Sequence, residues 1–131
     1  MPLIAKIVLE LAAALITLGG LYDLLTPKLP PNLLAICGGN AQAANLVREL
    51  LRALGGALIA IGLTVGALAA GFGPQDRRQT LVLILVLVIP SEGVNSFCMY
   101  RVGSPYYVPL GFLGLTLVGV MLAWSGYAPF G

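Results

Sequence analysis

Histidine is absent from this chain of 131 residues, and it has only two cysteines, Cys37 and Cys98. Histidine is the commonest general base and the commonest metal ligand in proteins. Two cysteines that lie far apart in the sequence cannot complete a zinc or iron–sulfur site by themselves. The sequence therefore predicts no metal site and no cofactor.

Charged residues are scarce as well. They make up 9% of the chain, whereas hydrophobic residues make up 59%. A soluble domain carries about 25% charged residues, so a chain this apolar could not be kept in water. The formal net charge of +2 is too small for a nucleic-acid-binding surface. The composition predicts an integral membrane protein that is surrounded by the lipid bilayer and has no nucleic-acid partner.

Four apolar stretches are long enough for a membrane-spanning helix, which needs about 20 residues. They predict helices at residues 3–25, 46–70, 79–100 and 107–125, with Asn45 as the N-cap of the second helix. The expected fold is all-α, a single transmembrane domain over residues 1–131. It forms a bundle of four transmembrane helices with both termini on the same side. We call that side A and the opposite side B.

The long loop at residues 26–45 connects the first two predicted helices. It begins with a proline-rich stretch, Thr26–Pro31, and continues with the apolar Leu33–Ile36. A loop of this length is usually functional or packed against its neighbours. We expect an interfacial or shallow re-entrant segment on side B. Lys and Arg are nearly balanced between the two sides, so the orientation in the membrane stays open.

Ionisable residues inside a membrane are costly and need partners. Arg52 and Glu92 lie about 10–12 Å inside the side-B ends of the second and third predicted helices, at 1.5 Å per residue. We expect them to form an ion pair, directly or through Asn95 or water. Two interpretations stay open: charges that hold helix ends together, or a binding site for a polar headgroup or an anionic ligand. Further charged residues expected at this end are Asp23, Arg48, Glu49 and Arg101.

Glu10 lies in the side-A half of the first predicted helix, and Lys6, one turn earlier, is its natural partner. A lone carboxylate in a first membrane helix also resembles the proton-coupling glutamate of small multidrug resistance transporters, which have four helices too. This chain lacks the other aromatic and glycine motifs of that family. A structural ion pair and a proton or ligand site therefore both stay open for Glu10 and Lys6.

Small residues recur at helical spacing in the second predicted helix. Gly62 and Gly66 form a GxxxG pair, and Ala70 extends the row. Such a row predicts close packing against another helix. That helix could belong to this bundle or to another membrane subunit.

The segment Arg48–Gly62, which contains Arg52-Ala-Leu-Gly-Gly56, resembles the second span of a family of small bacterial four-helix membrane proteins. That family is similar to the DoxX-like group and to the ergosterol-biosynthesis scaffold proteins. The resemblance implies a four-helix bundle in the bacterial inner membrane and an organising role. It brings no catalytic residues to this chain.

The expected function is a non-enzymatic accessory or scaffold subunit of a larger membrane complex, with other membrane subunits or a second copy as partners. The basis is the lack of a catalytic constellation and the abundance of small residues. The alternative is a small oligomeric transporter, or a protein that binds a lipid or small molecule, using Glu10 or the Arg52–Glu92 pair. An enzyme ranks third, because Cys98 or Glu92 would have to act without a recognisable base partner.

Overall fold

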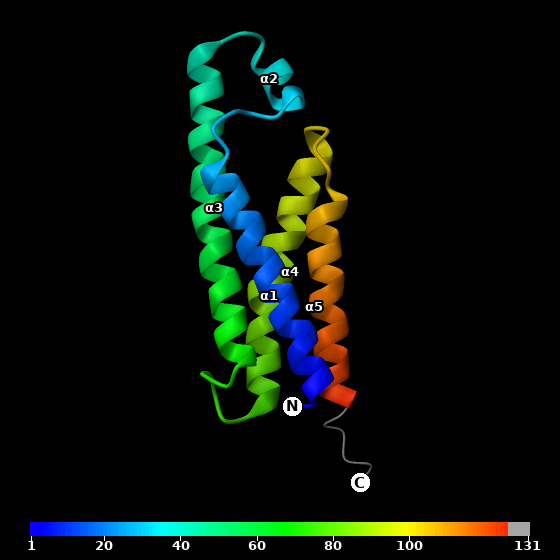
Figure 1. Cartoon of the computed structure of the whole chain (residues 1–131). Helices are drawn as coiled ribbons and strands as arrows, with labels where there is room; N and C mark the ends of the chain where they lie inside the picture. The colour runs from blue at the N-terminus through cyan, green and yellow to red at the C-terminus, as the bar shows by residue number, and fades with distance from the viewer. Residues whose placement is uncertain (126–131) are drawn as a thin grey trace.

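The computed structural model describes residues 1–125, in which helices are the only regular secondary structure. The four long helices are α1 (Leu3–Leu25), α3 (Ala41–Ala69), α4 (Arg77–Arg101) and α5 (Tyr107–Ser125), and the short α2 (Pro31–Cys37) follows α1 (Figure 1). Each long helix is long and apolar enough to cross a membrane. The chain is an integral membrane protein, and the predicted all-α bundle of four spanning helices is confirmed.

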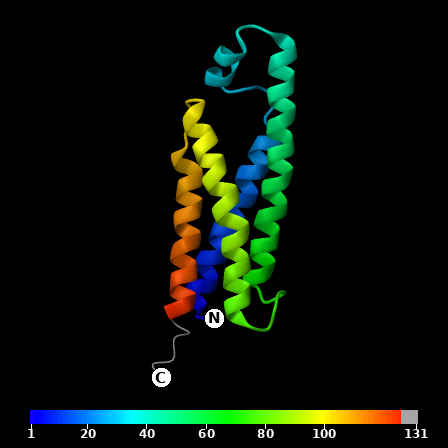
Figure 2. The ribbon, with the colours of Figure 1, turned by 180° about the vertical axis from the view of Figure 1, so that it is seen from behind.

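Helix α1 lies between two neighbours, α3 and α5, while α4 packs mainly against α5. The start of α1 and the end of α5 lie at the same end of the bundle, side A, as predicted (Figure 2). The core is formed by buried side chains from all four long helices, such as Ile16, Val65, Ile84 and Val120. Many other large apolar side chains point outward, where lipid replaces water as their surroundings.

Helices α1 and α3 meet along a seam of glycines. A Cβ atom on Gly20 would lie 2.6 Å from the carbonyl oxygen of Gly55, and one on Gly62 would lie 2.8 Å from the backbone nitrogen of Thr17. Only glycine allows two helix backbones to approach this closely. The GxxxG row therefore packs inside the bundle at Gly62, which α1 covers, while Ala70 lies past the end of α3 as its exposed C-cap.

Helix α3 begins five residues earlier than the predicted 46–70, at Ala41, and the prediction of Asn45 as its N-cap is wrong. The Oδ1 atom of Asn40 accepts hydrogen bonds from the backbone N–H groups of Gln42 (3.0 Å) and Ala43 (3.2 Å). The residues between the two asparagines, including three alanines, are mostly good helix formers. The first available cap therefore starts the helix, and α3 becomes the longest element.

The predicted long loop 26–45 contains α2 and the first turn of α3. Helix α2 lies beside the side-B part of α3, beyond the end of α1 (Figures 1 and 2). The side-chain amide of Asn32 donates to the carbonyl oxygen of Val102 (3.0 Å) and to the Oγ atom of Ser104 (2.9 Å). These two bonds connect α2 to the turn between α4 and α5 and fix it across the side-B end of the bundle.

Candidate functional site

A pocket of about 340 Å³ lies in the side-B half of the bundle, where all four long helices contribute to its lining. Apolar side chains form most of its wall, and two carboxylates and one amide are the polar exceptions. We call this space the Glu92 pocket. It is lined by Ile16, Gly19, Tyr22 and Asp23 of α1, Leu58 of α3, Glu92, Asn95 and Met99 of α4, Pro105, and Val108, Pro109 and Phe112 of α5.

Glu92 is the central polar group of this pocket. Its side chain is 1% exposed, and neither Oε1 nor Oε2 has a hydrogen-bond partner. It lies nine residues before the end of α4 at Arg101, which is about 14 Å along the helix axis. An isolated ionised carboxylate at such a depth is strongly disfavoured. Glu92 therefore needs either a bound proton or a cation supplied from outside the chain.

Helical spacing brings the polar residues of the pocket together. Glu92, Asn95 and Met99 are three and then four residues apart, so they lie on one face of α4. Asp23, near the end of α1, lines the same pocket from another wall. The pocket therefore presents two carboxylates and an amide to whatever occupies it, and no cationic side chain lines it.

The turn between α4 and α5 is held against the side-B end of the pocket. The hydroxyl of Ser96 donates to the carbonyl oxygen of Tyr106 at 2.9 Å, and Ser96 is itself buried. The rings of Tyr100 and Tyr106 make an edge-to-face contact with centroids 5.2 Å apart. These contacts fix Pro105 and the start of α5 where they line the pocket.

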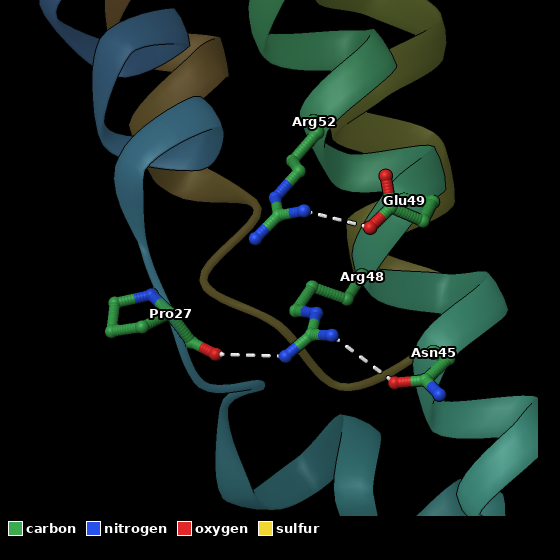
Figure 3. A network of polar contacts seen from close by, with 5 residues as sticks. All are labelled: Pro27, Asn45, Arg48, Glu49 and Arg52. Carbon is green, nitrogen blue, oxygen red and sulfur yellow. Dashed lines mark hydrogen bonds and ion pairs between the residues drawn. The ribbon is translucent and has the colours of Figure 1, made fainter.

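The structure contradicts the predicted ion pair between Arg52 and Glu92. Arg52 instead bonds Glu49, three residues earlier on α3, with 2.7 Å between Nη1 and Oε1 (Figure 3). The reason is that α3 extends past the end of α1 on side B, so the start of α3 does not mark the membrane surface (Figure 1). Gly55 packs against Gly20 and Leu24, which places Arg52 one turn further on, level with the end of α1. Arg52 therefore lies at the side-B surface, away from the Glu92 pocket.

The polar cluster predicted at side B separates into three parts. Asp23, Glu92 and Asn95 line the pocket, whereas Arg48, Glu49 and Arg52 belong to a surface network on α3 (Figure 3). In that network Arg48 donates to the carbonyl oxygen of Pro27 (3.4 Å) and to Oδ1 of Asn45 (3.2 Å). The third part is Arg101 alone, whose guanidinium lies 5.9 Å from the ring centroid of Phe97.

Glu10 does not form the predicted pair with Lys6: in residues 1–125 the sole ion pair is the one between Arg52 and Glu49. Lys6 is exposed and its long side chain can reach the side-A surface. Glu10 instead lies beside Gly66, where its Oε2 atom is 3.4 Å from the position of a Cβ. It borders a groove of about 500 Å³ between α1 and α3, whose other lining residues are Ala13, Ala14, Thr17, Leu18, Gly62, Leu63, Gly66 and Ala67.

The polar residues of the pocket could be identified from the sequence, whereas its apolar wall could not. Nothing in the sequence marked Tyr22, Met99 or Phe112 as pocket residues. The spacing of Met99 from Asn95 does place it on the same face of α4 as the polar residues. Over residues 1–125, no group of three or more potential ligands is placed to hold a metal ion. No protein-family model, curated protein or solved structure matches the chain.

Proposed function

We propose that this chain is a small-molecule-binding membrane protein whose ligand is an organic cation with an apolar body. The observation that carries the proposal is Glu92, a carboxylate that is buried in the bundle, without a hydrogen-bond partner, at the wall of a pocket of about 340 Å³. A protonated amine would neutralise the carboxylate and replace the hydrogen bonds that it lacks.

The remaining lining favours the same ligand class. Asp23 adds a second carboxylate, and the Asn95 carbonyl can accept a further hydrogen bond from an ammonium group. The apolar wall suits a hydrocarbon or aromatic body, and Phe112 and Tyr22 can make cation–π contacts. An anionic ligand would face two carboxylates and no cationic side chain. This arrangement departs from the anionic ligand that the predicted arginine cluster suggested.

Equilibrium dialysis of the purified full chain in a mild detergent tests the proposal. The probe is phenethylammonium, and the matched neutral probe is 2-phenylethanol, which has the same body and a hydroxyl in place of the ammonium group. We expect the cation to bind saturably and more tightly than the alcohol. Replacement of one charged hydrogen-bond partner costs about 1.5–3 kcal/mol, so Glu92→Gln should weaken cation binding at least tenfold.

Two further variants complete the experiment. Asp23→Asn changes the other carboxylate of the pocket and should also weaken binding, which keeps the test valid if Glu92→Gln does not fold. Glu49→Gln removes an exposed carboxylate at the same end of the molecule, outside the pocket, and should leave binding unchanged. Equal binding of the cation and the alcohol, or unchanged binding in both pocket variants, would refute the proposal. It would leave Glu92 as a protonated structural residue.

A second candidate function is an accessory subunit of a larger membrane complex, placed in the bacterial inner membrane as the likeness to DoxX-like and scaffold proteins implies. Glu10 favours it, because this carboxylate borders a groove on the α1–α3 surface without an ion pair or hydrogen bond from residues 1–125. A basic group on a neighbouring subunit would satisfy it. Co-purification of a stoichiometric partner that Glu10→Gln releases, and Glu49→Gln does not, would support this function. Purification of the unmodified chain without a partner would count against it.

A further inference from the structure

A second polar site lies outside the Glu92 pocket, where the loop after α1, the helix α2 and the side-B part of α3 meet. A pocket of about 210 Å³ is bordered there by Lys28 and Arg48, two cationic side chains from different elements. We call this space the Arg48 pocket. Its remaining lining residues are Pro27, Leu29, Leu34, Ala44 and Asn45.

The guanidinium of Arg48 is only partly satisfied. Its bonds to Pro27 and Asn45 are long, at 3.4 and 3.2 Å, and both acceptors are neutral (Figure 3). Its Nε atom is buried and has no hydrogen-bond partner. An arginine normally presents a fork of donors to a carboxylate or phosphate. Here, among residues 1–125, the Arg48 guanidinium is held only by its long hydrogen bonds to two neutral acceptors, and no anionic group is bonded to it.

The acidic groups nearby do not supply that anion. Glu49 is bonded to Arg52. Asp23 shares with Lys28 and Arg48 a small space of about 20 Å³, which has room for about one water molecule, and forms no ion pair with either. Neither Lys28 nor Arg48 therefore forms an ion pair with a carboxylate in residues 1–125.

The depth of this pocket in the membrane indicates which kind of anion it could bind. Arg48 lies two turns before Gly55, which packs at the end of α1, so it is about 10 Å further toward side B, at the level of the polar headgroups. Leu34 lines the pocket and is 47% exposed, and Ile36 on the same helix is 64% exposed. Exposed apolar side chains on a short helix are typical of the interfacial region of a bilayer.

We propose that Lys28 and Arg48 bind the phosphate of an anionic phospholipid headgroup. Helix α2 closes the pocket on its outer side, and the acyl chains of the bound lipid run from the phosphate toward the bilayer centre, along the spanning helices. This site has cationic side chains, whereas the Glu92 pocket has carboxylates, and it does not depend on the ligand of the Glu92 pocket. Either proposal can therefore fail without the other.

Native mass spectrometry of the full chain, released from detergent that contains equal amounts of phosphatidylglycerol and phosphatidylcholine, tests this inference. We expect the unmodified chain to retain phosphatidylglycerol at least fivefold over phosphatidylcholine. Arg48→Gln should abolish this preference, and Lys28→Gln should reduce it. Lys28 is exposed and lies in a loop, so its variant remains informative if Arg48→Gln does not fold. Arg101→Gln removes an exposed arginine at the same end of the molecule and should keep the preference.

A parallel titration with inorganic phosphate separates the two sources of the anion. A lipid site predicts no displacement of phosphatidylglycerol by millimolar phosphate, because the acyl contacts add to the affinity. Displacement that Arg48→Gln abolishes would instead assign the site to a free phosphate and overturn the lipid. Equal retention of the two lipids by the unmodified chain, or an equal loss with Arg101→Gln, would overturn the site itself.

Discussion

Helix α1 has two different neighbourhoods. Toward α3 it forms a seam in which glycines bring the backbones together, so that no space for a side chain remains at Gly20, Gly55 and Gly62. Toward α4 and α5 it borders a pocket with a buried carboxylate. The comparison shows how so small a bundle can keep an internal space. Close packing on one side fixes α1 against α3, so α1 cannot move to fill the pocket on the other side.

The largest expected effect tests the rigid side of this comparison. Gly62→Ala places a Cβ against the backbone of Thr17 and should destabilise the bundle by about 2 kcal/mol. Gly56→Ala, on the same helix with no atom within 4 Å of its Cβ position, should be neutral or stabilise by up to about 1 kcal/mol. Reversible unfolding in mixed detergent, followed by circular dichroism, measures both. Equal effects of the two variants would show that the seam is not tightly packed.

The next prediction concerns the pocket side. Glu92→Met removes a buried carboxyl without hydrogen-bond partners and should stabilise the bundle by about 1.5 kcal/mol while abolishing cation binding. Glu49→Met, at an exposed position, should change stability by less than about 0.5 kcal/mol. The same unfolding experiment measures both variants. Destabilisation by Glu92→Met would mean that the carboxyl has a structural partner, and the contrast between the two sides of α1 would be lost.

A smaller effect is expected where α2 joins the bundle. Asn32→Ala removes both hydrogen bonds to the α4–α5 turn and should favour local opening of α2 by about 1 kcal/mol. The half-buried Cys37 at the end of α2 should then react roughly fivefold faster with a maleimide. The exposed Cys98 is an internal control, and its rate should not change. An unchanged rate at Cys37 would show that α2 is held by other contacts.

The smallest effect is expected at the start of α3. Asn40→Ala removes the N-cap and should cost about 0.5 kcal/mol, which is at the low end for caps because this turn is exposed. Hydrogen exchange at the amides of Gln42 and Ala43 should accelerate about twofold. Asn45→Ala lies inside the helix and should leave these amides unchanged. Faster exchange in Asn45→Ala and unchanged exchange in Asn40→Ala would instead show that Asn45 is the N-cap.

The spans could be predicted from the sequence because their signal is local. Long apolar runs fix the existence of the four helices, and α1 and α5 match their predicted bounds. The start of α3 could not be placed, because two asparagines compete as caps and nothing local decides between them. Helix α2 was hidden for a related reason. Its seven residues are too few for a periodic pattern, and tertiary contacts through Asn32 hold it in place.

The candidate site could be predicted only in part. Glu92, Asn95 and Asp23 were recognised as polar residues in apolar surroundings, which is a property of the sequence. Their partners depend on how far each helix extends and on which helices are adjacent. Counting the depth of Arg52 from the start of α3 assumes that this helix begins at the membrane surface. Because α3 extends past the end of α1 on side B (Figure 1), that assumption places Arg52 too deep and produces a false ion pair. Depth along the membrane must be measured from packed neighbours, such as Gly20 against Gly55, and not from predicted helix ends.

The length of α3 has a consequence for the biosynthesis of the chain. Its 29 residues extend over about 43 Å, while the hydrocarbon core of a bilayer is about 30 Å thick. All its charges lie in the first twelve residues, so the remainder, Ala53–Ala69, can enter the bilayer without burying a charged group. Helix α1 carries Glu10 and Asp23, and helix α4 carries Glu92, within their spans, which makes their insertion more costly. During synthesis α3 can therefore remain in the membrane unaided, whereas α1 gains most from the helices that follow it and α4 from the helices that precede it.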